Sequence, residues 1–176
     1  MSTKLNLGCG TDIREGWINL DSALLPGVTV VHDVNTLPLP FPDSSFDEIL
    51  CQDIIEHIAE YVPLLKELHR ILTPGGRLRI QVPHFSSKNN FVDPTHRRMF
   101  SAFTFDFFAS DSELYRSRPY YFDFAFASLM SVEITFWRSS WIAPFINKTR
   151  YRQGFYEDTA LSRLFPAVNI VVVLKK

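Results

Sequence analysis

The feature that most constrains this chain is a series of short apolar runs, each rich in Ile, Val and Leu and each closed by a turn residue or an acid. Five precede residue 84 and two follow residue 131: 4–7, 17–21, 28–33, 46–52, 77–82, 132–138 and 169–175. Near-continuous apolar runs of this length are typical of parallel strands that are buried on both faces. The sequence therefore predicts a doubly wound α/β fold, with a seven-stranded, mostly parallel sheet and helices on both faces.

The clearest helix is expected between the fourth and fifth runs. Pro63 suits the first turn of a helix, and residues 73–76, Thr-Pro-Gly-Gly, end it. Apolar residues at helical spacing alternate with polar ones that we expect to face water. The apolar stripe consists of Leu64, Leu65, Leu68, Ile71 and Leu72, and the polar face of Lys66, Glu67 and Arg70. This helix would cover one face of the sheet.

Composition narrows the class of protein. The chain has 176 residues, of which 46% are apolar and 21% charged, so it is long enough for one core and too apolar to be disordered. We expect a single domain over 1–176. No run approaches the roughly 18 apolar residues of a membrane span, and the start of the chain lacks a signal-peptide core. Two cysteines, Cys9 and Cys51, form no disulfide framework. A cytoplasmic protein without a membrane segment is the prediction.

Residues 83–131 form an aromatic-rich insertion after the fifth predicted strand. Phe100, Phe103, Phe107 and Phe108 recur at nearly helical spacing. Two interpretations remain open. The rings pack a small extra helix onto the sheet, which is the commoner use of such a pattern, or they form the apolar underside of a lid over a ligand.

Small and acidic residues follow the first three predicted strands. Leu7-Gly8-Cys9-Gly10 is a turn in which a ligand can approach the backbone closely, because glycine lacks a Cβ. Asp21 and Asp33 end the second and third strands, where side chains line one crevice of a parallel sheet. Carboxylates there can accept hydrogen bonds from ribose hydroxyls and from an adenine amino group. Together these residues predict an adenosine site.

The ordered motifs of the chain resemble those of class I S-adenosylmethionine-dependent methyltransferases, which have a Rossmann-like fold. The resemblance extends to about residue 83 and rests on residues 5–10, Asp21, Asp33 with 37–47, and 68–76. It implies that S-adenosylmethionine is the cofactor and that the last strand is antiparallel. It also implies the cofactor-binding residues: Leu7, Gly8, Cys9 and Gly10 near the methionine part, Asp21 and Ser22 at the ribose, Asp33 and Val34 at the adenine, and Gln52 and Asp53 at the amino group, facing the substrate.

The chain departs from that pattern in its first helix. Only ten residues separate Gly10 from Asp21, so the helix is shortened and one sheet face is expected to be partly bare, covered by Trp17 or by a second subunit of a homo-oligomer. Position 13 is Ile13, where a dinucleotide fingerprint needs a third glycine, which disfavours an NAD(P)-dependent oxidoreductase. A cofactor-binding module that serves a partner enzyme without catalysing is the main alternative.

Oxygen on a small molecule is the expected methyl acceptor. Residues 51–54, Cys-Gln-Asp-Ile, lack the Asn/Asp-Pro-Pro-aromatic signature of enzymes that methylate DNA bases, and the chain has no broad basic stripe, so we expect no nucleic-acid partner.

Three histidines are candidate general bases: His84, His96 and His57. A hydrogen-bonded structural histidine is the commoner interpretation for His84 and His96, and an ordinary helix position is equally plausible for His57. His84, Asp93 and His96 match no strong metal template, so no metal is expected.

Residues 91–100 also resemble a small group of methyltransferases of polysaccharide or natural-product pathways. Within this segment, Asp93, Arg97 and Arg98 are candidate substrate-binding residues. The two guanidinium groups are suited to a phosphate or a carboxylate, although surface arginines are the plain alternative. An anionic small molecule, such as a sugar or its nucleotide conjugate, is the predicted acceptor class.

Overall fold

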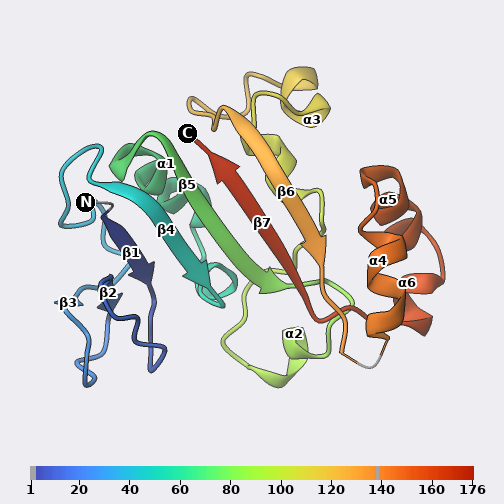
Figure 1. Cartoon of the computed structure of the whole chain (residues 1–176), viewed down its shortest axis with the longest axis horizontal. Coiled ribbons are helices and arrows are strands. Elements are labelled where there is room, and N and C mark those ends of the chain that lie inside the picture. Colours follow the sequence, from blue (N-terminus) through green and yellow to red (C-terminus); the bar gives the residue numbers. More distant parts are fainter. Residues whose placement is uncertain (1–2, 138) are drawn as a thin grey trace.

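The computed structural model describes residues 3–137 and 139–176 and contains one seven-stranded sheet (Figure 1). Its order is β3-β2-β1-β4-β5-β7-β6, and only β7 runs antiparallel to its neighbours. The predicted seven-stranded, mostly parallel sheet with an antiparallel last strand is confirmed. The strands are β1 (Lys4–Leu7), β2 (Ile18–Asp21), β3 (Val30–Val31), β4 (Phe46–Gln52), β5 (Leu72–Pro83), β6 (Ser128–Ile134) and β7 (Asn169–Lys175).

Three predicted strands, β1, β4 and β7, have the expected bounds, and the others differ. The fifth strand begins five residues earlier than expected, and the sixth strand is displaced as a whole by four residues from the expected 132–138. Its pairing with β7 sets its position, since Ile134 lies opposite Ile170 and Ser128 opposite Lys175. Phe136 and Trp137 follow the strand, and position 138 lies outside the described residues. Register against a neighbour therefore overrode local strand propensity.

Helix α1 (Tyr61–Ile71) packs Leu64, Leu65, Leu68 and Ile71 against one face of the sheet. Leu72, the fifth residue of the predicted stripe, is instead the first residue of β5. Pro63 lies in its first turn as expected. Glu67 was expected to face water but is buried, where its carboxylate accepts the Leu39 N–H at 2.7 Å and pairs with Arg70. The hydrogen bonds from Arg70 hold the pKa of Glu67 below its ordinary value despite burial. Glu67 thus fastens the loop before β4 to the helix.

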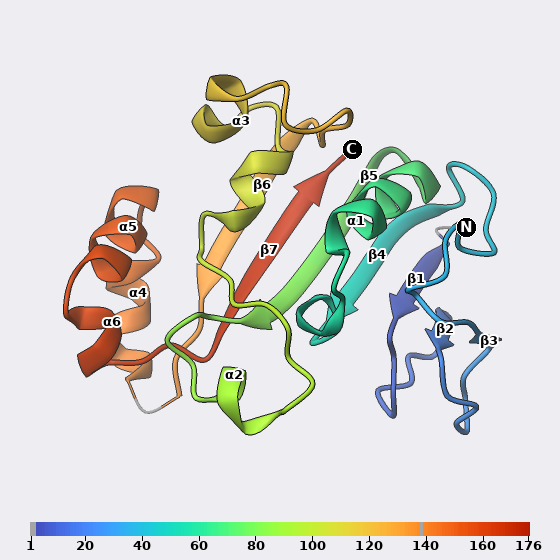
Figure 2. The same cartoon turned by 180° about the vertical axis from the view of Figure 1, so that it is seen from behind.

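The insertion continues the same covered face, as Figure 2 shows from behind. It contains α2 (Asn89–Val92), the 3₁₀ helix η2 (Thr104–Phe108) and α3 (Glu113–Ser117). Phe100, Phe105 and Phe108 are fully buried in the main core, and the rings of Phe100 and Phe105 stack at 5.6 Å. Tyr61 of α1 meets Phe100 edge-on. These rings therefore complete the core on this side of the sheet.

The opposite face of the sheet is bare, which corrects the expectation of helices on both faces (Figures 1 and 2). Among the described residues, no helix lies between β1 and β2 or between β2 and β3. Polar residues predominate on the uncovered face: Arg77 and Arg79 are exposed, and Lys4 pairs with Glu48 at 2.9 Å. Leu50 and Val171 lie on this face too and are buried among their neighbours. Trp17 lies under the Lys4 ammonium, 5.1 Å from ring centre to nitrogen. Alternation of polar and apolar residues in β5 suits a sheet with one solvated face.

Replacing Arg79 with alanine is expected to change the free energy of unfolding by less than about 0.5 kcal/mol, because an exposed side chain on a solvated face contributes little. The adjacent Ile80 faces the core, so Ile80→Val is expected to cost about 0.5–1.5 kcal/mol. Urea unfolding of both variants checks this. A larger loss for Arg79→Ala, growing with protein concentration, would show that a second subunit covers this face.

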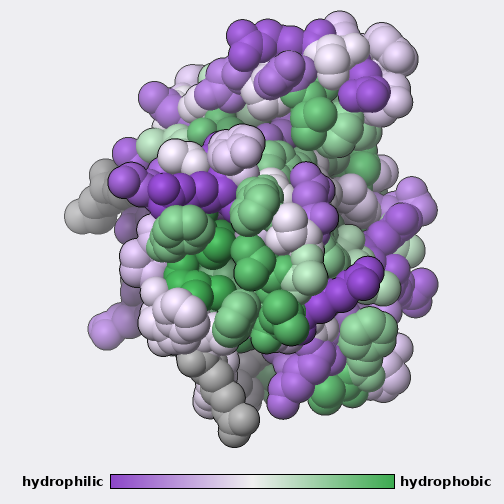
Figure 3. Space-filling model, turned by 90° about the vertical axis from the view of Figure 1, so that its right-hand side faces the viewer, coloured by the Kyte–Doolittle hydropathy of each residue, from purple (hydrophilic) through white to green (hydrophobic). Residues whose placement is uncertain are grey.

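A group of short helices lies at the β6 edge: η3 (Ser140–Ile142), α4 (Ala143–Ile146), α5 (Arg150–Asp158) and α6 (Leu161–Leu164). The Asn147 amide bonds both the N–H and the C=O of Ile134 at 2.8 Å, and Gln153 bonds the Val132 C=O. These side chains cap the edge strand. Apolar side chains gather on this end of the molecule, with Phe145 and Leu164 exposed (Figure 3). None of the described helices has both the length and the apolar character to cross a bilayer.

Candidate functional site

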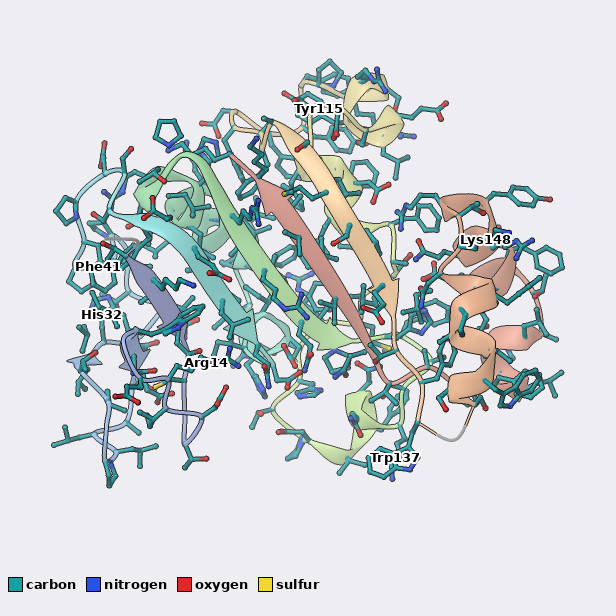
Figure 4. The ribbon with its side chains drawn as sticks, in the orientation of Figure 1. Arg14, His32, Phe41, Tyr115, Trp137 and Lys148 are labelled. Atoms are coloured by element: carbon teal, nitrogen blue, oxygen red, sulfur yellow. The ribbon has the colours of Figure 1, made fainter. Side chains whose placement is uncertain are left out.

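The carboxyl ends of β1 to β4 lie side by side at one edge of the sheet. Leu7 is in register with Leu20 on one side and with Cys51 on the other, and Asp21 is in register with Val31. The loops that leave these strands therefore meet, as a parallel sheet requires. Arg14 and His32, labelled in Figure 4, mark the loops after β1 and β3 at this end.

The loop after β1 is shaped by its two glycines. Gly8 and Gly10 have positive φ angles of 65° and 49°. A Cβ on Gly8 would lie 2.7 Å from Ile54 Cγ1, whereas a Cβ on Gly10 would meet nothing within 4 Å, so the Gly10 backbone borders open space. The Gly10 N–H donates to Asp21 Oδ2 at 2.8 Å. Leu7 and Cys9 bury their side chains, so they offer only their backbone to a ligand.

Asp21 joins the loops after β1, β2 and β3. Its carboxylate accepts the N–H groups of Gly10 and Ala23, and its C=O accepts the His32 N–H at 2.9 Å. Each carboxylate oxygen keeps one lone pair for a further donor. Asp21 is half-buried and the following Ser22 is exposed. This arrangement fits a ligand with adjacent hydroxyl groups, such as a ribose.

Asp33 and Val34 border the same edge. Asp33 is exposed, and its Oδ1 accepts both the backbone and the side-chain N–H of Asn35 at 2.9 Å. The backbone hydrogen bond from Asn35, followed by the side-chain one, lowers the pKa of Asp33, so the carboxylate is ionised at neutral pH. Val34 is buried. The structure thus brings the predicted glycines and acids together, in a geometry that fits a nucleoside.

Gln52 and Asp53 follow β4 on the far side of the glycine loop. Asp53 has a positive φ of 53°, which is uncommon for a residue with a side chain, and its N–H donates to the Gln81 C=O at 3.0 Å. The Gln81 side chain donates to its carboxylate at 3.1 Å. Burial raises the pKa of Asp53. This turn leads the chain from the end of β4 into the short helix that follows.

A cavity of about 350 Å³ opens beyond Asp53, at the carboxyl ends of β4 and β5. Residues from η1 (Ile55–His57), the insertion and the start of β7 enclose it. Its lining consists of Asp53, Glu56, His57, Pro83, Asn89, Val92, Asp93, His96 and Asn169. Five of these nine are ionisable, so the cavity is polar and predominantly acidic.

Hydrogen bonds fix the orientation of His57 in this cavity. Asp93 Oδ1 accepts the Thr95 hydroxyl at 2.6 Å, and Thr95 Oγ1 lies 2.8 Å from His57 Nδ1. The hydroxyl has one proton and gives it to the carboxylate, so Nδ1 of His57 must be the donor to Thr95. Burial, followed by the proximity of His96, lowers the pKa of His57. The neutral ring therefore keeps its lone pair on Nε2.

Glu56 and His96 lie beside His57. The rings of His57 and His96 are 4.6 Å apart and nearly perpendicular. His96 Nε2 is 4.0 Å from Glu56 Oε1 and 3.9 Å from Asp93 Oδ2. Glu56 is completely buried, which raises its pKa to about 8. Sequence reasoning missed Glu56, although its place directly before His57 was a usable sign.

The remaining predicted residues lie elsewhere. His84 is fully buried, with Nε2 3.0 Å from Glu157 Oε1 and Nδ1 2.8 Å from Ser86 Oγ, so it has no access to a substrate and we do not retain it as a base. Arg98 bonds the Ala59 C=O at 2.9 Å and lies over the Tyr61 ring. Arg97 is exposed, and neither arginine lines the acidic cavity. Of the three predicted substrate-binding residues, only Asp93 lines it.

Comparison with known proteins agrees with the motifs and the fold. Residues 5–80 match the family model described as a methyltransferase domain. A demethylmenaquinone methyltransferase from Listeria welshimeri is 35% identical over 66 residues, which cover 38% of this chain and 28% of that protein. A structure of a SAM-dependent methyltransferase from Archaeoglobus fulgidus has a TM-score of 0.67 at 18% identity, covering 99% of this chain and 86% of that one. A structure of an S-adenosylmethionine-dependent methyltransferase from Mesorhizobium loti has a TM-score of 0.60 at 16% identity, covering 99% of this chain and 90% of that one.

The chain therefore has the fold of S-adenosylmethionine-dependent methyltransferase structures, and its residues 5–80 are similar to a methyltransferase domain. The match to that family model covers less than half of the chain. The aligned part is less than a third of the Listeria relative, so that protein's acceptor does not follow for this chain.

Proposed function

We propose that this protein binds S-adenosylmethionine at the loops after β1 to β4 and transfers its methyl group to an oxygen atom of a small molecule. The Gly8–Gly10 loop would border the methionine part, Asp21 the ribose hydroxyls, and Asp33 with Val34 the adenine. The cofactor supplies a methyl group that is already activated by a sulfonium. The protein therefore has to align the acceptor and accept its proton.

The observation that supports this proposal most is the position of the acidic cavity. It begins at Asp53, directly beside the cofactor loops, and contains two imidazoles. An oxygen acceptor needs a base, and His57 presents a lone pair whose tautomer is fixed by Thr95. Three carboxyl groups line the cavity, so we replace the predicted anionic acceptor by a neutral hydroxylated one.

A second cavity suggests the rest of the acceptor. It has a volume of about 990 Å³, shares Asn89 with the acidic cavity and is bordered by Phe91 and Trp137. Both aromatic side chains are largely exposed, and Trp137 lies at the same end of the molecule as α2 (Figure 4). We infer an acceptor with a hydroxylated end in the acidic cavity and an apolar or ring-containing part against these side chains.

Asp21→Ala is expected to weaken the binding of S-adenosylhomocysteine by about 5- to 150-fold, equivalent to roughly 1–3 kcal/mol, because hydrogen bonds to a charged acceptor are lost. Calorimetry measures this. Asp123→Ala is the matched control, since Asp123 is exposed and paired with Lys66 of α1. Unchanged affinity in Asp21→Ala, with the melting temperature retained, would contradict the ribose assignment.

Turnover with labelled S-adenosylmethionine tests the activity itself. The acceptor panel should contain quinols, as the name of the Listeria relative suggests, together with phenols, neutral sugars and sugar phosphates. Methylation of a neutral hydroxyl compound supports the proposal. Cofactor binding without turnover on any acceptor supports the non-catalytic module, and tighter binding of NAD or NADP than of S-adenosylhomocysteine would support an oxidoreductase.

A further inference from the structure

We propose that Glu56, His57 and His96 form a binding site for one divalent transition-metal ion, such as Zn²⁺, at the wall of the acidic cavity. This proposal departs from the expectation of no metal site. It also differs from the set of His84, Asp93 and His96 weighed from the sequence, because His84 lies outside the cavity. The role of the ion in methyl transfer rests on the proposed function, whereas the binding of the ion does not.

The three side chains meet in the geometry of an incomplete coordination sphere. One ligand atom from each can be chosen so that all lie within 4.8 Å of one another. Ligands at about 2.1 Å from one ion are roughly 3–4 Å apart, so the side chains need to close by only about 1 Å. The backbone is already fastened here, since the Arg97 N–H donates to the Glu56 C=O at 2.8 Å. The two contributing segments are thus held together beside the cavity.

Unpaired polar atoms are the second, independent observation. Both carboxylate oxygens of Glu56 are buried and have no hydrogen-bond partner among the described residues, and the same holds for His96 Nδ1. Glu56 has no exposed surface at all. A buried carboxyl group without a partner is costly, and such groups normally bond to protein, to water or to an ion. A cation at this point would satisfy the carboxylate and accept the imidazole lone pairs.

The surroundings of His57 are those of a metal-binding histidine. Thr95 and Asp93 fix the proton on Nδ1, which directs the Nε2 lone pair away from them. Histidines that bind metals usually donate their other N–H in this way, and the outer partner holds the ring in position. Asp93 Oδ2 also lies 3.9 Å from His96 Nε2, so the Asp93 carboxylate lies close to both imidazole rings.

The ligand set indicates the kind of ion and its use. Two imidazoles and one carboxylate suit Zn²⁺ and its first-row neighbours better than Mg²⁺ or Ca²⁺, which prefer oxygen ligands. Three protein ligands leave a coordination position for a ligand from the cavity, as in catalytic rather than structural sites. An ion held there would make a bound hydroxyl group more acidic. His57 Nε2 would then be a ligand and no longer the base, and the proton would pass to the Asp53 carboxylate, which lines the same cavity.

Calorimetry of the chelator-treated full chain with Zn²⁺ alone, and with Co²⁺ alone for its visible absorbance, tests the site. We expect one equivalent to bind. Glu56→Gln and His96→Gln should each weaken Zn²⁺ affinity at least about 100-fold, and Thr95→Val about 10-fold through the orientation of His57. His69→Gln is the matched control, because His69 lies at the other end of α1. This variant should bind Zn²⁺ with the affinity of the wild type.

Absence of Zn²⁺ and Co²⁺ binding to the wild type, or equal affinity in Glu56→Gln and wild type, would overturn the inference. Loss of fold cannot imitate the expected result, because glutamine keeps the size of Glu56 and the metal-free variant should melt no lower than the metal-free wild type. S-adenosylhomocysteine binding is measured in parallel. If the protein binds S-adenosylhomocysteine but no metal ion, only this inference is overturned. If it binds the metal ion but not S-adenosylhomocysteine, only the proposed function is overturned.

Discussion

His57→Gln is expected to lower kcat about 10²- to 10⁴-fold on whichever acceptor the panel identifies, while S-adenosylhomocysteine binds with unchanged affinity. The reason is the Nε2 lone pair, which Thr95 and Asp93 hold available in the acidic cavity. Glutamine has no comparable lone pair on a basic nitrogen, so it can neither accept the acceptor's proton nor act as an imidazole ligand for the proposed metal ion. Single-turnover kinetics with saturating cofactor measure the loss directly.

Two further variants separate chemistry from folding. Thr95→Val keeps the volume of the side chain but removes the oxygen that fixes the tautomer of His57, so we expect a smaller loss in kcat with little change in the melting temperature. His69→Gln alters a histidine at the far end of α1, outside the cavity. A wild-type kcat in His57→Gln, with folding confirmed, would remove His57 from the reaction.

The residues of the proposed cofactor site were predictable because each lies next to the end of a strand in the sequence. Gly8, Gly10, Asp21 and Asp33 each follow directly on a strand, and parallel strands place their carboxyl ends together whatever the remaining packing. The 2.8 Å bond from Gly10 to Asp21 is the result expected of that rule. Residue type and strand order were sufficient here.

The acceptor half was less predictable, because it depends on contacts between distant segments. Glu56 matters only because the insertion brings His96 to it from forty residues away. The bare face was expected only beside the shortened first helix, because apolar runs elsewhere suggested strands buried on both faces. Arg77 and Arg79 alternate with Leu78 and Ile80, and this alternation was the sign of a solvated face that the sequence did contain.

His84 shows most clearly why residue type does not define a role. It directly follows β5, at the edge where active-site residues gather, yet its ring is completely buried. Glu157 of α5, which is 73 residues away, determines this outcome by bonding His84 Nε2 at 3.0 Å. The same carboxylate accepts the Ser101 hydroxyl at 2.5 Å and the Ala102 N–H at 2.7 Å. It therefore joins the C-terminal helices to the insertion.

Glu157→Ala is expected to lower the free energy of unfolding by about 3–5 kcal/mol at neutral pH, because it leaves the buried partners of a nearly buried carboxylate unpaired. Only 9% of the Glu157 side chain is exposed. Glu157→Gln, which keeps one carbonyl acceptor, should lose less, and Asp158→Ala, at the exposed neighbouring position, should stay within about 0.5 kcal/mol. Urea unfolding measures all three, and a loss below about 1 kcal/mol in Glu157→Ala would show that the three hydrogen bonds do not stabilise the fold.

The difference between wild type and Glu157→Ala should also depend on pH. Burial alone would raise the pKa of Glu157, but the hydrogen bonds from His84, Ser101 and Ala102 outweigh it, so the pKa lies below its ordinary value. A carboxyl group whose pKa is lower in the folded state stabilises that state fully above its unfolded pKa, about 4.3, and loses this contribution as the pH falls through the folded pKa. We therefore expect the two proteins to differ most near pH 7 and to converge below about pH 4. A difference that stays constant from pH 7 to pH 3 would mean that the ionised form of Glu157 has no part in joining α5 to the insertion.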